Sequence, residues 1–200
     1  MSFLLVVTIS IGVIVYTFLF QKDGLQTLPR EVCKGSVSRS LVQKILKDTE
    51  SVDLRNGQSS PDSFFRFTCS AFTHEKSGLI VEARIRDTGI EGWREWEHTQ
   101  GEAEKGRSIQ FHIGSGVVIS WPRRSSLYLK CNPSLEEDNP VEAYALVVVA
   151  SLQGDMRIDG NSLRQSVAEV TLQMARYAQR AVKCEDSPYL PAPSNQPVPL

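Results

Sequence analysis

The first twenty residues of this chain contain no Asp, Glu, Lys or Arg. An uncharged, apolar run of this length matches the roughly 30 Å thickness of a bilayer core. A cleaved signal peptide would instead begin with basic residues, have a shorter apolar stretch and end in small residues. Met1, Ser2 and Phe3 offer no basic side chain, and bulky residues occupy 16–20. We therefore predict that residues 1–20 are a transmembrane anchor rather than a removed signal peptide.

The sequence also lacks the short motifs of common enzyme classes: GxSxG, HExxH, SxxK, GxxxxGK[ST] and GxGxxG are all absent. The histidines are only three, His74, His98 and His112, and we interpret them as structural. A pair of them with Asp87 or Glu97 could hold a metal or activate a nucleophile, but their spacing carries no signature. We expect no catalytic residue, no metal and no cofactor, although a triad assembled in space stays open.

A strong net charge is missing as well: the chain has 22 Lys and Arg against 23 Asp and Glu, and with its three histidines neutral the net charge is −1. The basic residues of the middle third are interleaved with acidic residues. Nucleic-acid-binding proteins instead concentrate Lys and Arg on one face. The pattern indicates a solvated surface of mixed charge, and we expect no nucleic-acid partner.

Four cysteines are present, and their spacing is not that of a metal site. Disulfides persist where thiols are not kept reduced, and four cysteines allow three connectivities. We favour Cys33 with Cys69 and Cys131 with Cys184, because each pair would tie a helix end to a strand. Each bridge would contribute about 3 to 4.5 kcal/mol in the chain-entropy description. The alternative is four buried free thiols in a cytosolic domain.

Two signals disagree about which side of the membrane the domain occupies. Lys22, Arg30 and Lys34 follow the apolar run, so the positive-inside rule would place the domain in the cytoplasm. Large domains, however, translocate largely regardless of charge. We give the cysteines more weight and predict a single-pass protein of the cell membrane with its domain on the extracytoplasmic side.

The remaining pattern predicts one α+β domain over 32–186, in which an antiparallel sheet is packed by an N-terminal helix and a long C-terminal helix. Helical spacing of apolar residues occurs at 36–47 and 163–181, residues 53–62 have turn chemistry, and 87–105 fit no regular pattern. Residues 21–31 are a spacer and the proline-rich 187–200 an extended tail. Strand patterns cover 65–71, 79–86, 109–113, 117–121, 127–131 and 144–152.

Trp93, Arg94 and Trp96 are the candidate binding residues. Two tryptophans three positions apart beside a guanidinium and glycines resemble the anchors of protein interfaces. Two alternatives stay open: the tryptophans cover the sheet as part of the core, or they contact lipid headgroups.

The cysteines lie in short motifs with a distinctive order. After one N-terminal apolar segment and a spacer come Cys33-Lys34-Gly35-Ser36-Val37, Phe67-Thr68-Cys69 and Leu129-Lys130-Cys131, and the last helix carries Ala175-Arg176-Tyr177-Ala178 before Cys184. In this layout the chain resembles small actinobacterial cell-envelope proteins of unknown function, and it departs from them in its long tryptophan-containing segment. The resemblance implies an anchored, extracytoplasmic, disulfide-bearing α+β domain and transfers no catalytic residue.

From these features we predict a membrane-anchored, non-enzymatic module that binds a protein or another envelope component. The alternatives are an envelope-acting hydrolase with an unrecognised site and a carrier of small ligands or lipids. A cleft with His98 or His112 near a carboxylate and a hydroxyl would favour the enzyme, and a large apolar pocket would favour the carrier. Exposed Trp93 and Trp96 beside Arg94 would favour the binding module.

Overall fold

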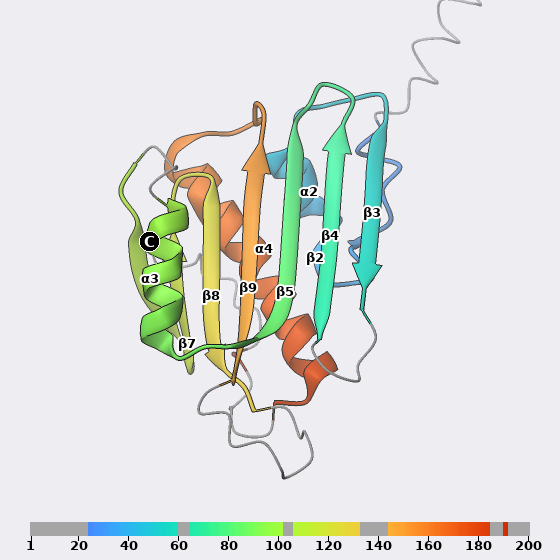
Figure 1. The fold of residues 1–200 in the computed structure, drawn as a ribbon. Helices are drawn as coiled ribbons and strands as arrows, with labels where there is room; N and C mark the ends of the chain where they lie inside the picture. The colour runs from blue at the N-terminus through green and yellow to red at the C-terminus, as the bar shows by residue number, and fades with distance from the viewer. Residues whose placement is uncertain (1–23, 60–64, 102–105, 133–143, 185–189, 192–200) are drawn as a thin grey trace, which may run out of the picture.

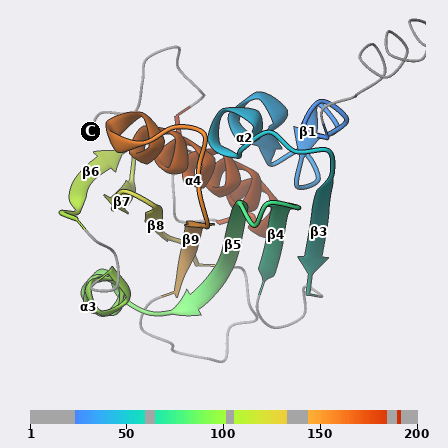
Figure 2. The same ribbon diagram turned by 90° about the horizontal axis from the view of Figure 1, so that it is seen from above.

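The structure, a computed structural model, describes residues 24–59, 65–101, 106–132, 144–184 and 190–191. A seven-stranded antiparallel sheet forms its centre, with strand order β3-β4-β5-β9-β8-β7-β6. Helices α2 and α4 lie on one face of the sheet and helix α3 lies on the other (Figure 1) (Figure 2). The predicted α+β class, the antiparallel sheet and the long C-terminal helix are confirmed.

The strands form two meanders, and β9 joins them in the middle of the sheet. β9 is central because its run from Ala145 to Val148 is buried on both faces, as a nearly continuous apolar strand requires. The strands are β3 (Val52–Gln58), β4 (Arg66–Thr73), β5 (Gly78–Asp87), β6 (Ile109–Ile113), β7 (Gly116–Ser120), β8 (Arg124–Lys130) and β9 (Tyr144–Gln153).

Helix α4 (Gly160–Val182) crosses the inner face of the sheet and forms the main core with it. Its buried stripe includes Leu163, Val167, Val170 and Met174, whose spacing of three or four residues places them on one side of a helix. Helix α2 (Arg39–Ile45) packs beside α4 and buries Leu41, Val42 and Ile45. A two-stranded sheet of β1 (Glu31–Val32) and β2 (Val37–Ser38) precedes α2.

Two disulfides join Cys33 to Cys69 and Cys131 to Cys184. These are the pairs favoured on sequence grounds, and they fit an oxidising, extracytoplasmic compartment. Cys131 and Cys184 lie just after β8 and α4, so this bridge ties a strand to a helix end. Cys33 differs from the expectation, because it lies in the turn between β1 and β2 rather than at a helix end.

Two segments differ from the sequence-based expectation. Residues 53–62 were expected to be turns, but β3 runs from Val52 to Gln58 as an edge strand. Asn56 and Gly57 are tolerated there because β3 has a neighbour on one side only, where they pair with Cys69 and Thr68. Residues 87–105 matched no regular pattern, but they contain α3 (Ile90–Gly101).

Two further predictions concern the ends of the chain, the anchor at 1–20 and the tail at 187–200. Within the described part of the chain, no helix is both long and apolar enough to cross a bilayer, and the predicted anchor at 1–20 lies outside it. Of the predicted tail, Leu190 and Pro191 are described and pack against α4. The backbone N–H of Leu190 donates to Gln179 Oε1 at 2.9 Å, and Arg176 Nε donates to the carbonyl oxygen of Pro191 at 2.8 Å.

Candidate functional site

Trp93 holds α3 against the outer face of the sheet. Its side chain is 1 % exposed, its Nε1–H donates to Ser126 Oγ at 3.0 Å, and its ring centroid lies 5.5 Å from that of Tyr128. The small core around it is made of residues from β7, β8, β9 and the turn between β7 and β8, with Val117, Ile119, Trp121, Ala145 and Val147 as further buried members. Trp93 is therefore a core residue, which was one of the alternatives for this tryptophan.

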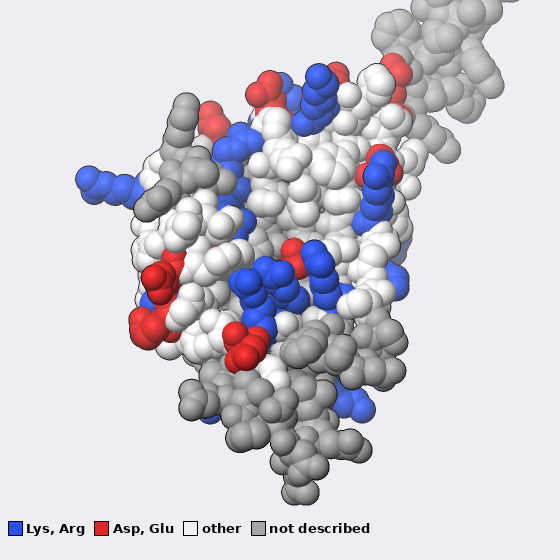
Figure 3. Space-filling view, in the orientation of Figure 1, with Lys and Arg blue, Asp and Glu red and all other residues white. Residues whose placement is uncertain are grey.

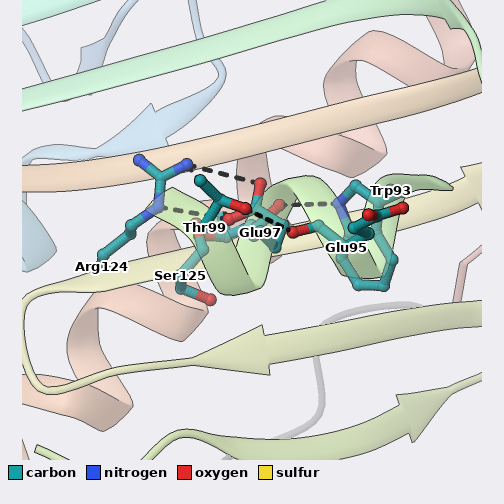
Figure 4. A network of polar contacts seen from close by, with 8 residues as sticks. Trp93, Glu95, Glu97, Thr99, Arg124 and Ser125 are labelled. Carbon is teal, nitrogen blue, oxygen red and sulfur yellow. Dashed lines mark hydrogen bonds and ion pairs between the residues drawn. The ribbon is translucent and has the colours of Figure 1, made fainter. Parts of the chain in front are cut away.

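One turn further along α3, Glu97 forms a buried ion pair with Arg124 of β8 (Figure 4). The side chain of Glu97 is 0 % exposed and that of Arg124 is 14 % exposed, with 3.1 Å between Arg124 Nη2 and Glu97 Oε2. Arg124 Nε donates to the same oxygen at 3.2 Å. Burial raises the pKa of Glu97, while the charges of Arg124 and Arg86 and a hydrogen bond with Ser126 oppose that rise.

Trp96 differs from Trp93, because it is half-exposed at the border between α3 and the sheet. Three guanidinium groups surround its indole ring. Their central carbons lie 4.3 Å (Arg86), 5.6 Å (Arg124) and 5.8 Å (Arg84) from the ring centroid. These distances are those of cation–π contacts, which each contribute about 0.5 to 2 kcal/mol depending on exposure.

Arg66 of β4 extends this group, since it pairs directly with Arg84 in the register of β4 and β5. We call Arg66, Arg84, Arg86 and Arg124 the arginine cluster. Two carboxylates face it: Glu97, which pairs with Arg124, and Glu82, whose Oε1 lies 3.0 Å from Arg66 Nε and 3.5 Å from Arg84 Nη1. Four positive charges thus meet two negative ones, and the cluster keeps a positive excess.

Arg86 is the member of the cluster without an acidic partner. Among the described residues its side chain makes no ion pair or hydrogen bond, and its contact is with the ring of Trp96. Partial burial and the neighbouring charge of Arg84 lower the pKa of Arg86, and the negative charges of Glu97 and Glu82 offset this only in part. The positive excess is therefore centred on Arg86 and Arg84.

The arginine cluster borders a sheet surface that no described helix covers. Helix α3 packs over β7, β8 and β9, so the outer sides of β3, β4 and β5 are uncovered (Figure 1) (Figure 2). Figure 3, which shows this side, has a group of Lys and Arg side chains over the lower parts of β4 and β5. We call this surface the open face; besides the cluster it presents the half-buried residues Thr68, Ser70, Phe72, Ile80 and Glu82.

Arg94, the third predicted binding residue, forms an ion pair within its own helix, α3. Its Nη1 lies 2.6 Å from Glu91 Oε1, and its side chain is 29 % exposed. The structure thus separates the three predicted residues: Trp93 is in the core, Arg94 is paired on α3, and Trp96 contacts the arginine cluster.

The histidines do not come together. His74, His98 and His112 are all exposed and lie on the β4–β5 hairpin, on α3 and on β6. No described group of three His, Cys, Asp or Glu residues could hold a metal ion. One surface depression is lined by Thr49, Glu50, Ser51, His74 and Glu75, all of them polar, so it lacks the apolar lining of a lipid carrier.

Arg66, Arg84, Arg86 and Arg124 were not singled out as a site from the sequence, and Glu97 was considered only as a partner of the histidines. One signal was available: Glu82, Arg84 and Arg86 alternate with buried residues on β5, so they had to share one side of the sheet. The approach of Arg124 and Trp96 depends on strand order and on α3, which the sequence did not indicate.

No protein-family model, no curated protein and no solved structure matches this chain. The resemblance to small actinobacterial envelope proteins therefore stays a prediction, and the chain is assigned to no family.

Proposed function

We propose that this protein is a membrane-anchored, extracytoplasmic, non-enzymatic binding module, and that its partner is a protein with an acidic surface. The anchor in this proposal is the uncharged segment 1–20. The extracytoplasmic setting fits the two disulfides. The observation that carries the proposal is the grouping of three guanidiniums around Trp96 at the edge of the open face.

The residue types on this surface support a protein partner. Tryptophan and arginine are enriched where truncation of a side chain costs most binding energy, because they combine large contact area with directed polar groups. The half-buried Phe72 and Ile80 lie further along β4 and β5 towards their hairpin and supply apolar area on the same side of the sheet. A sheet surface also presents a broad platform, which suits a protein surface better than a small ligand.

The charge of the surface supports an acidic partner. The arginine cluster exceeds its two carboxylates by two positive charges, and complementary potentials across an interface speed encounter and fix its register. Association should therefore weaken as salt is added, since exposed charges are screened over about 8 Å at physiological ionic strength.

Site-specific photo-crosslinking with the full chain in its native membrane tests this proposal. A photo-crosslinking residue replaces Ile80 on the open face, and in a matched control it replaces Lys44, which is exposed on α2. We expect a discrete crosslinked protein from position 80 and none from position 44. The partner, once identified and purified, should bind the full chain directly, and less tightly at higher salt.

Charge reversal supplies the control for specificity. Arg84→Glu with Arg86→Glu should abolish the crosslink from position 80, whereas Arg180→Glu, on the exposed side of α4, should leave it unchanged. Equal crosslinking from positions 80 and 44, or a crosslink that survives the double charge reversal, would contradict the proposal.

A further inference from the structure

We propose that Arg86 and Arg84, beside Trp96, form a subsite for one carboxylate group of the partner, an Asp or Glu side chain. This inference rests on the proposed function, because it names the chemical group through which the acidic protein is held. In the arginine cluster, Glu82 forms ion pairs with Arg66 and Arg84, and Glu97 forms one with Arg124. Arg86 has no acidic partner among the described residues.

The contact with Trp96 positions Arg86 without using up its donors. A guanidinium has five N–H groups in a rigid plane and no acceptor. A carboxylate partner would occupy these N–H groups, whereas attraction to an aromatic ring leaves most of them available. With its central carbon 4.3 Å from the ring centroid, Arg86 is held in place and can still donate to an incoming oxyanion.

Arg84 supplies the second cation. It lies two residues before Arg86 on β5, so both side chains leave the same side of the sheet, about 7 Å apart along the strand. Its interaction with Glu82 is long, at 3.5 Å, and Glu82 is also shared with Arg66 at 3.0 Å. An anion between Arg84 and Arg86 would therefore meet two guanidiniums that are not saturated by internal carboxylates.

The surroundings favour a carboxylate over a phosphate. Phosphate sites usually add backbone N–H groups from a helix N-terminus or an anion-binding turn. The backbone of β5 is paired with β4 and β9 on its two sides, so its N–H groups point along the sheet and not out of it. Asp87 ends β5 and Glu91 lies in the first turn of α3, and their negative charges would repel a dianion more strongly than a carboxylate.

The subsite also lies far from where the described chain begins. Gly24 N–H donates to the carbonyl oxygen of Thr49, at the end of the sheet where the β4–β5 hairpin lies. Arg86 lies eight positions after Gly78 on β5, about 26 Å away at 3.3 Å per residue. The subsite is therefore at the opposite end of β5 from the hairpin beside which the described chain begins.

An NMR titration of the full chain in zwitterionic micelles tests the subsite. The ligand is a neutral-ended peptide with two glutamates, and the same peptide with two glutamines is its control. We expect saturable shifts of the Arg86 Nε–H and Trp96 indole N–H signals with the glutamate peptide alone. Arg86→Gln should weaken binding about tenfold or more, because a charge-assisted pair is lost, and Arg180→Gln should not.

Several results would overturn the subsite: equal shifts with both peptides, shifts that follow ionic strength without saturating, or saturable binding of inorganic phosphate but not of the glutamate peptide. If Arg86→Gln does not fold, the wild-type titration decides, since Arg86 must be among the signals that move. If a partner is crosslinked but the glutamate peptide does not bind, the carboxylate subsite is contradicted and the open face is still supported as the binding surface. If the peptide binds but no partner is crosslinked, the subsite is supported and the proposed protein partner is contradicted.

Discussion

Two tryptophans three positions apart have different roles in this domain. Trp93 is 1 % exposed and bonds to Ser126, whereas Trp96 is half-exposed against the arginine cluster. The difference follows from helix geometry: a step of four residues returns to the same side of a helix, so Trp93 and Glu97 both face the sheet. A step of three leaves Trp96 at the border, where its ring contacts the arginines.

At the residue scale, Glu97 should make stability depend on pH. Burial raises its pKa above the ordinary carboxyl value. From about pH 4.3, where an unfolded Glu ionises, up to the higher folded pKa, the folded state binds the proton and the unfolded state does not. The free energy of unfolding should therefore fall as pH rises through this interval.

The measurement compares wild type with Glu97→Gln, which cannot titrate at this position. We expect the difference in free energy of unfolding, wild type minus variant, to decrease with rising pH across this interval and then become constant. Glu91→Gln is the control, because Glu91 lies on the same helix with its side chain 80 % exposed. A difference that grows with pH would mean that Arg124 outweighs burial.

At the scale of elements, α3 contacts the sheet through Trp93, Glu97 and Gly101, which are spaced by four residues. Gly101 lies directly on the indole of Trp121, which is 3 % exposed and belongs to the same small core. The absence of a side chain at this position is what allows the last turn of α3 to approach the sheet.

Gly101→Ala should therefore be destabilising although alanine is the better helix former. Its Cβ would collide with Trp121, and overpacking of this kind costs about 1 to 3 kcal/mol. Gly89→Ala, at the start of the same helix, is the matched control, because a Cβ there meets nothing within 4 Å. Urea unfolding with the disulfides intact measures both variants. Equal effects on the free energy of unfolding would contradict the packing explanation.

The same contacts explain what the sequence could and could not predict. The alternation in β4 and β5, the valine-rich run of β9 and the stripe of α4 identify their elements, because burial there follows a simple period. In α3 the buried positions are Trp93, Glu97 and Gly101, so no apolar stripe marks the helix. The arginine cluster combines residues from β4, β5 and β8, and only the three-dimensional strand order brings them together.

At the scale of the whole molecule, the two disulfides fit an oxidising compartment, and this can be tested directly. We expect a maleimide reagent, added during denaturation of freshly prepared membranes, to label none of the four cysteines before reduction and all four after it. A protease added from the extracytoplasmic side should digest the domain without permeabilisation. Thiols that react before reduction, or protection of the domain from outside, would contradict this setting.

The disulfides also determine how a cleaved chain would behave. Residues 60–64 lie between Cys33 and Cys69, and residues 133–143 lie between Cys131 and Cys184. A peptide bond broken in either stretch leaves both fragments covalently joined, so the nick becomes visible on a gel only after reduction. Residues 102–105 lie outside both covalent rings. A break there would yield two polypeptides with no covalent link, held together by noncovalent contacts: the pairing of β5 with β9, and the packing of α2 against α4 and of α3 against β8.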